Sequence, residues 1–284
     1  MSFLIEGVLV RHDPVGPRLP VLFDSPHSGA VYPPDFGFVC PFHALRQGED
    51  TYVDELFGAV PEFGATLLCA LFPRTYIDAN RAADDFDPRL IEGRWPTPLR
   101  PSAKSAGGLG LIRTLCRPGM PLYTGKLPAA AVAARIERYY RPYHEQVTAA
   151  IDGNVADFGA SWHVDCHSMP SAGDGGGADF VVGDRDGTTS ERGFVELVAR
   201  ALRGFGYAVA INHPYKGVEL VRRYGKPARG RHSIQLEVNR RLYMNEETLE
   251  KHAGFAVVQR DLTALARQIC GYAESRLSER RAAE

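Results

Sequence analysis

The chain has 284 residues, of which 44% are hydrophobic and 24% are charged. This balance is typical of a globular protein with a sizeable core, and it excludes a disordered regulator, a collagen-like fibre and a polytopic membrane protein. The 33 Lys and Arg residues nearly cancel the 34 Asp and Glu residues, so no sequence-wide positive field favours nucleic acid. An anionic ligand must therefore be held by a local pocket, and we expect no nucleic-acid partner.

Cysteine usage and the N-terminal residues predict a cytoplasmic protein without membrane association. The five Cys residues are scattered and include no Cys-x-x-Cys pair, which argues against a disulfide framework and against a cysteine-built zinc site. Residues 1–7 lack the basic and apolar regions of a signal peptide, and no run approaches the about 18 apolar residues of a membrane span. No repeat or long linker divides the chain, so we expect a single domain over residues 1–284, with a mobile glycine-rich loop at 171–177.

Short apolar, β-rich runs alternate with helical periodicity along the chain. We predict strands over 21–24, 66–72, 161–165, 179–182, 208–211 and 233–238. We predict helices over 132–147, with a kink at Pro142, and over 191–203 and 246–269. This alternation favours an α/β fold, a three-layer sandwich with a mixed, mainly parallel central sheet. In such sheets ligands bind beyond the carboxyl ends of the strands.

Two of the predicted strands lead into histidines. The first breaks into Pro26-His27-Ser28-Gly29, a rigid turn that holds the imidazole of His27 at the rim of the sheet. A turn histidine that caps a backbone carbonyl gives the same pattern. In the strand predicted at 161–165 and just beyond it, alternation places His163, Asp165 and His167 on one face, with His167 nearest the rim. Burying three such groups is costly unless they bind a metal or one another, and one satisfied core histidine plus a salt bridge is the alternative.

Carboxylates from two other segments could complete such a site. One face of the strand at 233–238 is apolar and the other carries Glu237, which needs a role if the strand is buried on both faces; a half-exposed edge strand has the same pattern. Glu49 and Asp50 open a predicted short helix, where carboxylates are also common as N-caps. Two histidines and one carboxylate, with an open fourth position, are typical of a hydrolytic zinc site, and a separate Glu beside them acts as general base.

Arginine residues supply a further signal. Arg74, Asn80 and Arg81 lie in a stretch without helical periodicity, and Arg113 follows the glycine-rich run at 107–110. Because the guanidinium group binds carboxylates in a bidentate manner, these residues are candidates for binding a substrate carboxylate. Ordinary surface arginines are the alternative. The glycine run lacks the strand and helix that flank a phosphate-binding loop.

At these residues the sequence resembles the N-formylglutamate amidohydrolase family (formylglutamate deformylase-like proteins), which is similar in fold to the zinc carboxypeptidases. The matching motifs occur in family order from residue 20 to residue 245, so the resemblance covers most of the chain. They are Asp24-Ser-Pro-His-Ser-Gly, Arg74-Thr-Tyr-Ile-Asp-Ala-Asn-Arg-Ala, Tyr140-Arg-Pro-Tyr-His, Asp165-Cys-His-Ser, Asn212-His-Pro-Tyr-Lys-Gly, Gln235-Leu-Glu and Leu242-Tyr-Met-Asn. Each motif is short, and the series is more specific than any one of them.

The resemblance implies a carboxypeptidase-like α/β fold and one divalent metal ion, zinc. Its ligands would be His27, His167 and Asp50, with Glu49 as the rival to Asp50. Glu237 would then be the residue that activates a water molecule.

The resemblance also gives the basic residues roles. Asn80 and Arg81 would grip a substrate carboxylate, with Arg113 as a further substrate-binding candidate, and Arg74 would stabilise the oxyanion. The implied reaction is hydrolysis of the amide of a small N-acyl amino acid, with N-formyl-L-glutamate as the first expectation, a step of histidine catabolism. A zinc carboxypeptidase, another N-acyl amino acid deacylase and a non-catalytic carboxylate-binding protein are the alternatives.

Overall fold

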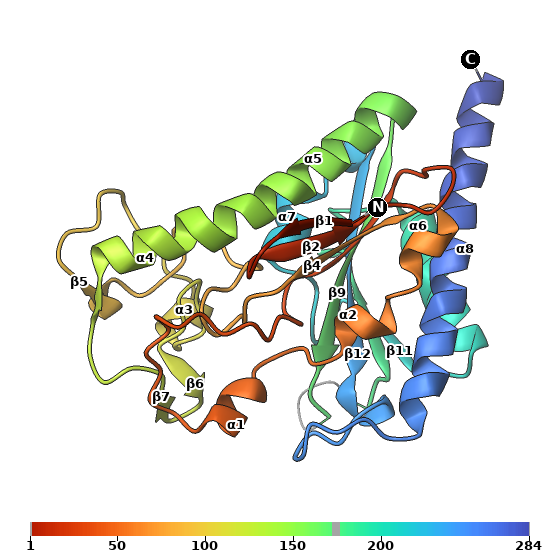
Figure 1. Cartoon of the computed structure of the whole chain (residues 1–284). Coiled ribbons are helices and arrows are strands. Elements are labelled where there is room, and N and C mark those ends of the chain that lie inside the picture. The colour runs from red at the N-terminus through yellow and green to blue at the C-terminus, as the bar shows by residue number, and fades with distance from the viewer. Residues whose placement is uncertain (1, 172–176, 284) are drawn as a thin grey trace.

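A computed structural model describes residues 2–171 and 177–283, and within them eight strands form one sheet (Figure 1). In spatial order they are β1 (Ser2–Ile5), β2 (Leu9–His12), β4 (Thr66–Ala70), β3 (Val21–Ser25), β9 (Ser161–Met169), β12 (Arg231–Asn239), β10 (Phe180–Gly183) and β11 (Val209–Ile211). The four central strands β4, β3, β9 and β12 run parallel to one another, and β11 runs parallel to β10. The pairs β1–β2, β2–β4 and β12–β10 are antiparallel. The predicted α/β fold with a mixed, mainly parallel sheet is confirmed. Of the loop predicted at 171–177, residues 172–176 lie outside the described residues.

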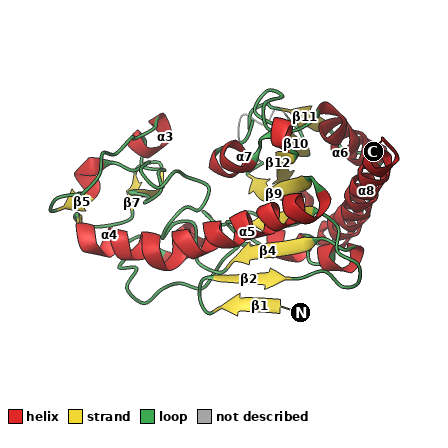
Figure 2. Ribbon diagram, turned by 90° about the horizontal axis from the view of Figure 1, so that it is seen from above, coloured by secondary structure: helices red, strands yellow, loops and turns green. Residues whose placement is uncertain are grey.

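Helices cover both faces of the sheet (Figure 2). They are α1 (Phe42–Arg46), α2 (Val53–Leu56), α3 (Ala103–Ala106), α4 (Ala129–Arg135), α5 (Arg141–Phe158), α6 (Arg192–Gly204), α7 (Glu219–Tyr224) and α8 (Gly254–Ala283). The helices α6 and α8 pack with α2 on one face, and α5 and α7 pack on the other. Two short ribbons, β5 (Ile91–Glu92) with β8 (Leu127–Pro128) and β6 (Leu115–Arg117) with β7 (Met120–Pro121), lie outside the main sheet.

The two hydrophobic cores follow from alternation along the strands. On β3, Val21 and Phe23 contribute to the core beneath α8, whereas Leu22 contributes to the core beneath α5. Both faces of the central strands are therefore buried, and every residue of β9 is buried. The strand β12 lies between β9 and β10, so the alternative of a half-exposed edge strand for residues 233–238 is wrong.

Each of the six predicted strands is present, but two helix predictions need correction. The helix predicted at 132–147 runs from α4 into α5 with a π-helical turn at Ile136–Tyr140. This turn ends two residues before Pro142, which lacks the backbone N–H that a regular turn requires. The helix predicted from residue 246 begins only at Gly254, because the side chain of Asn245 accepts hydrogen bonds from the backbone N–H groups of Glu247 and Thr248 and forms a turn instead. The sequence prediction also missed β1 and β2.

Candidate metal centre and active site

The residues of the candidate site lie near or just beyond the ends of neighbouring parallel strands. His27 lies two residues beyond β3, and His167 lies near the end of β9. Glu237 on β12 is the register partner of His167, so the two side chains lie on the same face of the sheet. The turn after β3 passes so close to the end of β4 that a Cβ atom on Gly29 would lie 2.4 Å from the backbone of Leu71 and Phe72, which explains the glycine after Pro26-His27-Ser28.

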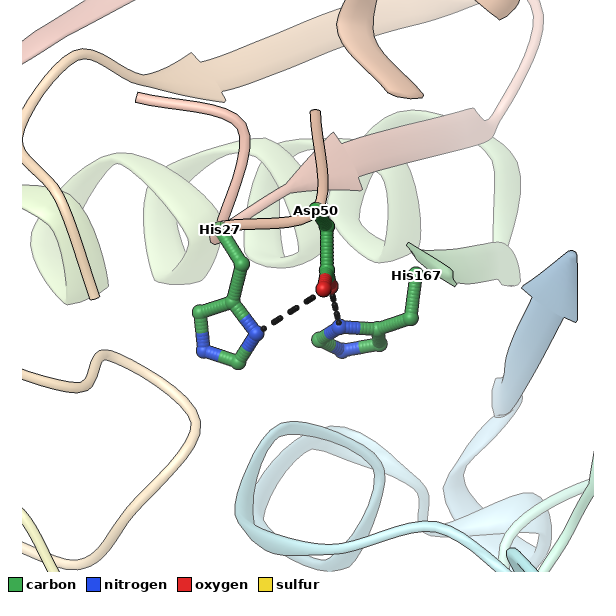
Figure 3. A group of neighbouring side chains, drawn as sticks. All are labelled: His27, Asp50 and His167. Atoms are coloured by element: carbon green, nitrogen blue, oxygen red, sulfur yellow. Dashed lines mark hydrogen bonds and ion pairs between the residues drawn. The ribbon is translucent and has the colours of Figure 1, made fainter. Parts of the chain in front are cut away.

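The structure brings His27, Asp50 and His167 together at this edge of the sheet (Figure 3). Asp50 Oδ2 lies 3.4 Å from Nδ1 of His27 and 2.9 Å from Nδ1 of His167. One nitrogen or oxygen atom from each residue lies within 4.8 Å of the others, and all three side chains are buried. Two imidazole nitrogens and one carboxylate oxygen are the donor set of hydrolytic zinc sites. We call these three residues the triad.

A second carboxylate fixes each imidazole of the triad. Nε2 of His27 lies 2.6 Å from Asp78 Oδ1, and Nε2 of His167 lies 2.8 Å from Asp165 Oδ1. These pairs direct both Nδ1 atoms towards Asp50, and His27 Nδ1 has no hydrogen-bond partner within the described part of the chain. Carboxylates in this outer position orient metal-binding histidines and fix their tautomer. The alternative of His27 as a cap for a backbone carbonyl is therefore wrong.

The charge states of His27 and Asp50 also suit a cation, whereas Asp165 and Asp50 raise the pKa of His167 against the effect of burial, so this imidazole must lose a proton to bind one. Burial and the nearby Arg74 lower the pKa of His27, so its imidazole is neutral. Burial acts to raise the pKa of Asp50, but the hydrogen bond from His167, the nearby imidazole of His27 and the charge of Arg74 outweigh it and hold that pKa well below its usual range. A neutral imidazole and an ionised carboxylate are the forms that bind a metal ion.

The structure separates Asp50 from its rival. The Glu49 carboxylate accepts hydrogen bonds from the Tyr32 hydroxyl and from Arg46, away from the two histidines. Neither acid is an N-cap, because α2 begins after Tyr52 and has no side-chain cap. Of the three polar residues that share one face of β9, His163 is the core histidine, and both of its ring nitrogens have partners. Nε2 lies 2.7 Å from Asp24, and Nδ1 lies 2.8 Å from the Ser233 hydroxyl.

Glu237 lines the same cavity as the triad, a space of about 500 Å³. Its Oε1 accepts a hydrogen bond of 2.7 Å from Gln235, which fixes the carboxyl group in place. Burial, together with the charges of Asp50 and Asp165, raises the pKa of Glu237 to about 7, against the opposing charge of His167. A carboxyl group with a pKa near neutrality can both accept and return a proton.

The predicted basic residues also line this cavity. Arg74 donates to Asp78 at 3.0 Å, and its Nε has no hydrogen-bond partner in the described residues. Arg81 donates to the carbonyl oxygens of Leu109 and Asn80. Both Arg81 and Arg113 are buried, so neither is an ordinary surface arginine. The side chain of Asn80 hydrogen-bonds within the protein: Nδ2 donates to Asp165 at 3.0 Å, and Oδ1 accepts from the backbone of Leu220.

The sequence profile of the N-formylglutamate amidohydrolase family matches residues 19–244, which include the triad, Glu237 and the basic residues of the cavity. The chain belongs to the N-formylglutamate amidohydrolase family.

Individual relatives agree with this family assignment. The chain is 30% identical to the N-formylglutamate deformylase of Pseudomonas aeruginosa over 239 residues, which cover 81% of this chain and 84% of the relative. It is 50% identical to an N-formylglutamate amidohydrolase of Ralstonia eutropha JMP134 with a solved crystal structure; the TM-score is 0.91, and the match covers 95% of this chain and 99% of the other. A gene product of Agrobacterium tumefaciens with a TM-score of 0.69 and 17% identity shares the fold, over 96% of this chain and 95% of the other.

Sequence reasoning gave no role to two residues of this family member's site. Asp78, within the motif that starts at Arg74, holds His27. Arg240 holds the opposite side of the triad: its guanidinium group donates to Asp50 Oδ1 at 3.1 Å, to the Ser168 hydroxyl and to the Gln47 carbonyl. Arg240 directly follows β12, at the edge of the sheet where the histidines lie, and this position in the sequence could have indicated its role in the site.

Within the described residues, no helix has the length and apolar character to cross a membrane.

The outer carboxylates yield a prediction about metal affinity. Replacing Asp78 by Asn removes the charge that orients His27, so we expect a metal affinity 10- to 100-fold lower, measured by competition with a chromophoric chelator. Asp24→Asn is the matched control, because Asp24 holds the core histidine His163 in the same way, at 2.7 Å. The control should lower thermal stability and leave metal affinity unchanged. Equal metal affinity in Asp78→Asn and in the unchanged protein would contradict the role given to Asp78.

Proposed function

We propose that this protein hydrolyses the amide bond of N-formyl-L-glutamate to formate and L-glutamate in a metal-dependent reaction. The observation that carries the proposal is the convergence of the triad and Glu237 in one cavity of a chain from this family. The reaction consumes one water molecule and breaks the bond between the formyl carbon and the amino nitrogen. The product amino acid suits a step in histidine catabolism, and we place the enzyme in the cytoplasm.

The donor atoms of the triad fit zinc. Two imidazole nitrogens and one carboxylate oxygen converge, and the buried His27 Nδ1 makes no hydrogen bond among the described residues, as expected of an atom that serves a ligand. A zinc ion held there would supply Lewis-acid polarisation of the formyl carbonyl and a water molecule of lowered pKa.

The protein's own residues supply the proton transfers and the charge stabilisation. Glu237, with a pKa of about 7, accepts a proton from the attacking water and returns it to the leaving nitrogen. Arg74 remains charged because Asp78 and Asp50 raise its pKa against the effect of burial, and its unpartnered Nε is a donor for the developing oxyanion. Arg81 and Arg113 bind carboxylate groups of the substrate, and Asn80 lines the cavity beside them and holds Asp165 in place.

The proposal is tested by metal analysis of the purified protein joined to a formate-release assay. We expect close to one zinc ion per chain and faster turnover of N-formyl-L-glutamate than of N-acetyl-L-glutamate or of peptides with a C-terminal Glu. A preference for a larger acyl group would identify another N-acyl amino acid deacylase, and a preference for the peptides would identify a carboxypeptidase. Binding without metal-dependent turnover of any of these compounds would identify a non-catalytic carboxylate-binding protein and contradict the proposed hydrolysis.

A further inference from the structure

The cations that line the catalytic cavity fall into two groups. Within the described residues, three have a carboxylate at 2.7 to 3.1 Å: Arg74 has Asp78, Arg240 has Asp50, and Lys216 has Asp186. The other three, Arg81, Arg113 and Lys104, have no carboxylate within 3.5 Å in the described part of the chain. Because uncompensated cations in a cavity repel one another, this second group favours an anionic ligand.

Arg113 lies in the inner part of the cavity. It is buried, its Nε has no hydrogen-bond partner within the described residues, and its Nη2 lies 3.7 Å from Asp78, the residue that holds His27. A carboxylate bound to Arg113 is therefore close to the triad. In an N-acyl amino acid, the α-carboxylate is the anionic group nearest to the amide bond, so Arg113 suits the α-carboxylate.

Lys104 lies at the outer end of the cavity. It belongs to α3, is exposed, and lines both the catalytic cavity and an adjoining outer cavity of about 420 Å³. Glu219 and Arg222 of α7 also line the outer cavity, and Figure 2 shows α3 and α7 as two separate helices. Among the described residues the side-chain ammonium group of Lys104 has no hydrogen-bond or ion-pair partner, and only its backbone carbonyl accepts a hydrogen bond, from Leu109. Partial burial and the charges of Arg81, Arg74 and Arg113 lower its pKa, and a bound anion relieves that repulsion.

We infer that Lys104 binds the side-chain carboxylate of the substrate and makes the enzyme selective for N-acyl derivatives of acidic amino acids. The inference rests on the proposed function, because the amide bond must lie at the triad for the far carboxylate to reach the outer end. With the α-carboxylate on Arg113, the extended side chain of a glutamate residue carries its second carboxylate away from the triad and towards α3. Two substrate carboxylates thus meet separate cations, at the inner and outer ends of the cavity.

The test compares N-formyl-L-glutamate with its neutral isostere N-formyl-L-glutamine. For Lys104→Met we expect the ratio of the two kcat/KM values to fall 10- to 100-fold, the usual loss for a hydrogen bond to a charged group. Lys104→Arg keeps the charge and should retain most of the preference. Arg100→Met is the matched control, because Arg100 lines the outer cavity but not the catalytic one, and lies 3.8 Å from Asp84. If Lys104→Met changes the ratio no more than Arg100→Met does, Lys104 acts only through its general positive charge and the inference is overturned.

Binding measurements separate this inference from the proposed function. In titration calorimetry of the metal-loaded protein, L-glutamate should bind more tightly than L-glutamine, and Lys104→Met should remove that difference. If the unchanged protein releases no formate but shows this pattern, the proposed function fails, while Lys104 is still shown to bind a side-chain carboxylate of the ligand. If formate is released and Lys104→Met alters neither the kinetic ratio nor the binding difference, the role of Lys104 is overturned and the proposed function stands.

Discussion

Replacing Glu237 by Gln is expected to lower kcat by about 10³-fold while the bound metal stays at the level of the unchanged protein. Glutamine has nearly the same size as glutamate, and its amide oxygen can still accept the hydrogen bond from Gln235 that Glu237 Oε1 accepts at 2.7 Å. The amide cannot accept the proton of a water molecule, so the substitution removes the proton transfer and little else. Steady-state kinetics and metal analysis of the same preparation measure both quantities.

The pH profile provides a second readout for Glu237. Only the ionised carboxylate is a base, so kcat/KM of the unchanged protein should fall as the pH decreases through the pKa of this group. That midpoint should be no higher than about 7, the value set mainly by burial, because a cation in the triad favours the ionised form and lowers the pKa further. Glu237→Gln should lack this acidic limb.

Glu49→Gln is the matched control for this substitution. Glu49 is a buried carboxyl group next to Asp50 in the chain, but its partners are Tyr32 and Arg46 and it does not line the cavity. We expect its kcat and metal content to remain close to those of the unchanged protein. Undiminished turnover in Glu237→Gln would remove Glu237 as the base, and metal loss in Glu49→Gln would return the choice of ligand to Glu49.

Replacing His27 by Ala is expected to abolish metal binding, and activity with it. The side chain is buried and supplies one of the two nitrogen donors, and alanine leaves no atom that can take its place. Chelator treatment of the unchanged protein should give the same loss of activity, and added zinc should restore it only where His27 is present. Metal stoichiometry after dialysis, together with formate release, measures the effect.

A variant of the core histidine controls for damage to the fold. His163 is as buried as His27 and is paired with a carboxylate in a similar way, yet it does not line the cavity. His163→Gln should therefore lower the thermal midpoint and keep its metal. Full metal stoichiometry at unchanged affinity in His27→Ala would show that His27 is not a ligand.

The three buried histidine–aspartate pairs show how one local arrangement serves different purposes. His27 with Asp78 and His167 with Asp165 direct their free nitrogens towards Asp50 at the cavity, whereas His163 with Asp24 directs its second nitrogen towards Ser233 inside the core. The pairs share their residue types and nearly their distances. What distinguishes them is their position relative to the carboxyl ends of the strands, where the chain leaves the sheet and a cavity can form.

Local patterns in the chain predict six of the eight strands of the main sheet and the kinds of residue at their ends. Hydrophobic runs predict the parallel strands, and alternation along one of them places His163, Asp165 and His167 on one face. The motifs placed His27 and Glu237 at the same edge of the sheet. These features are local, since a period of two residues and a turn of four residues depend only on neighbours in the chain.

Which of these polar groups come into contact depends on the tertiary fold. His163 and His167 are four residues apart on β9, about 13 Å along a strand at about 3.3 Å per residue, so one ends in the core and the other at the edge. The choice of Asp50 over Glu49 depends on which carboxylate faces the histidines after the turn before α2, and on Arg240, 190 residues away in the chain. Asp78 and Lys104 acquire their roles in the same way. Such contacts join segments that are distant in sequence, and packing, which no short pattern encodes, sets their distances.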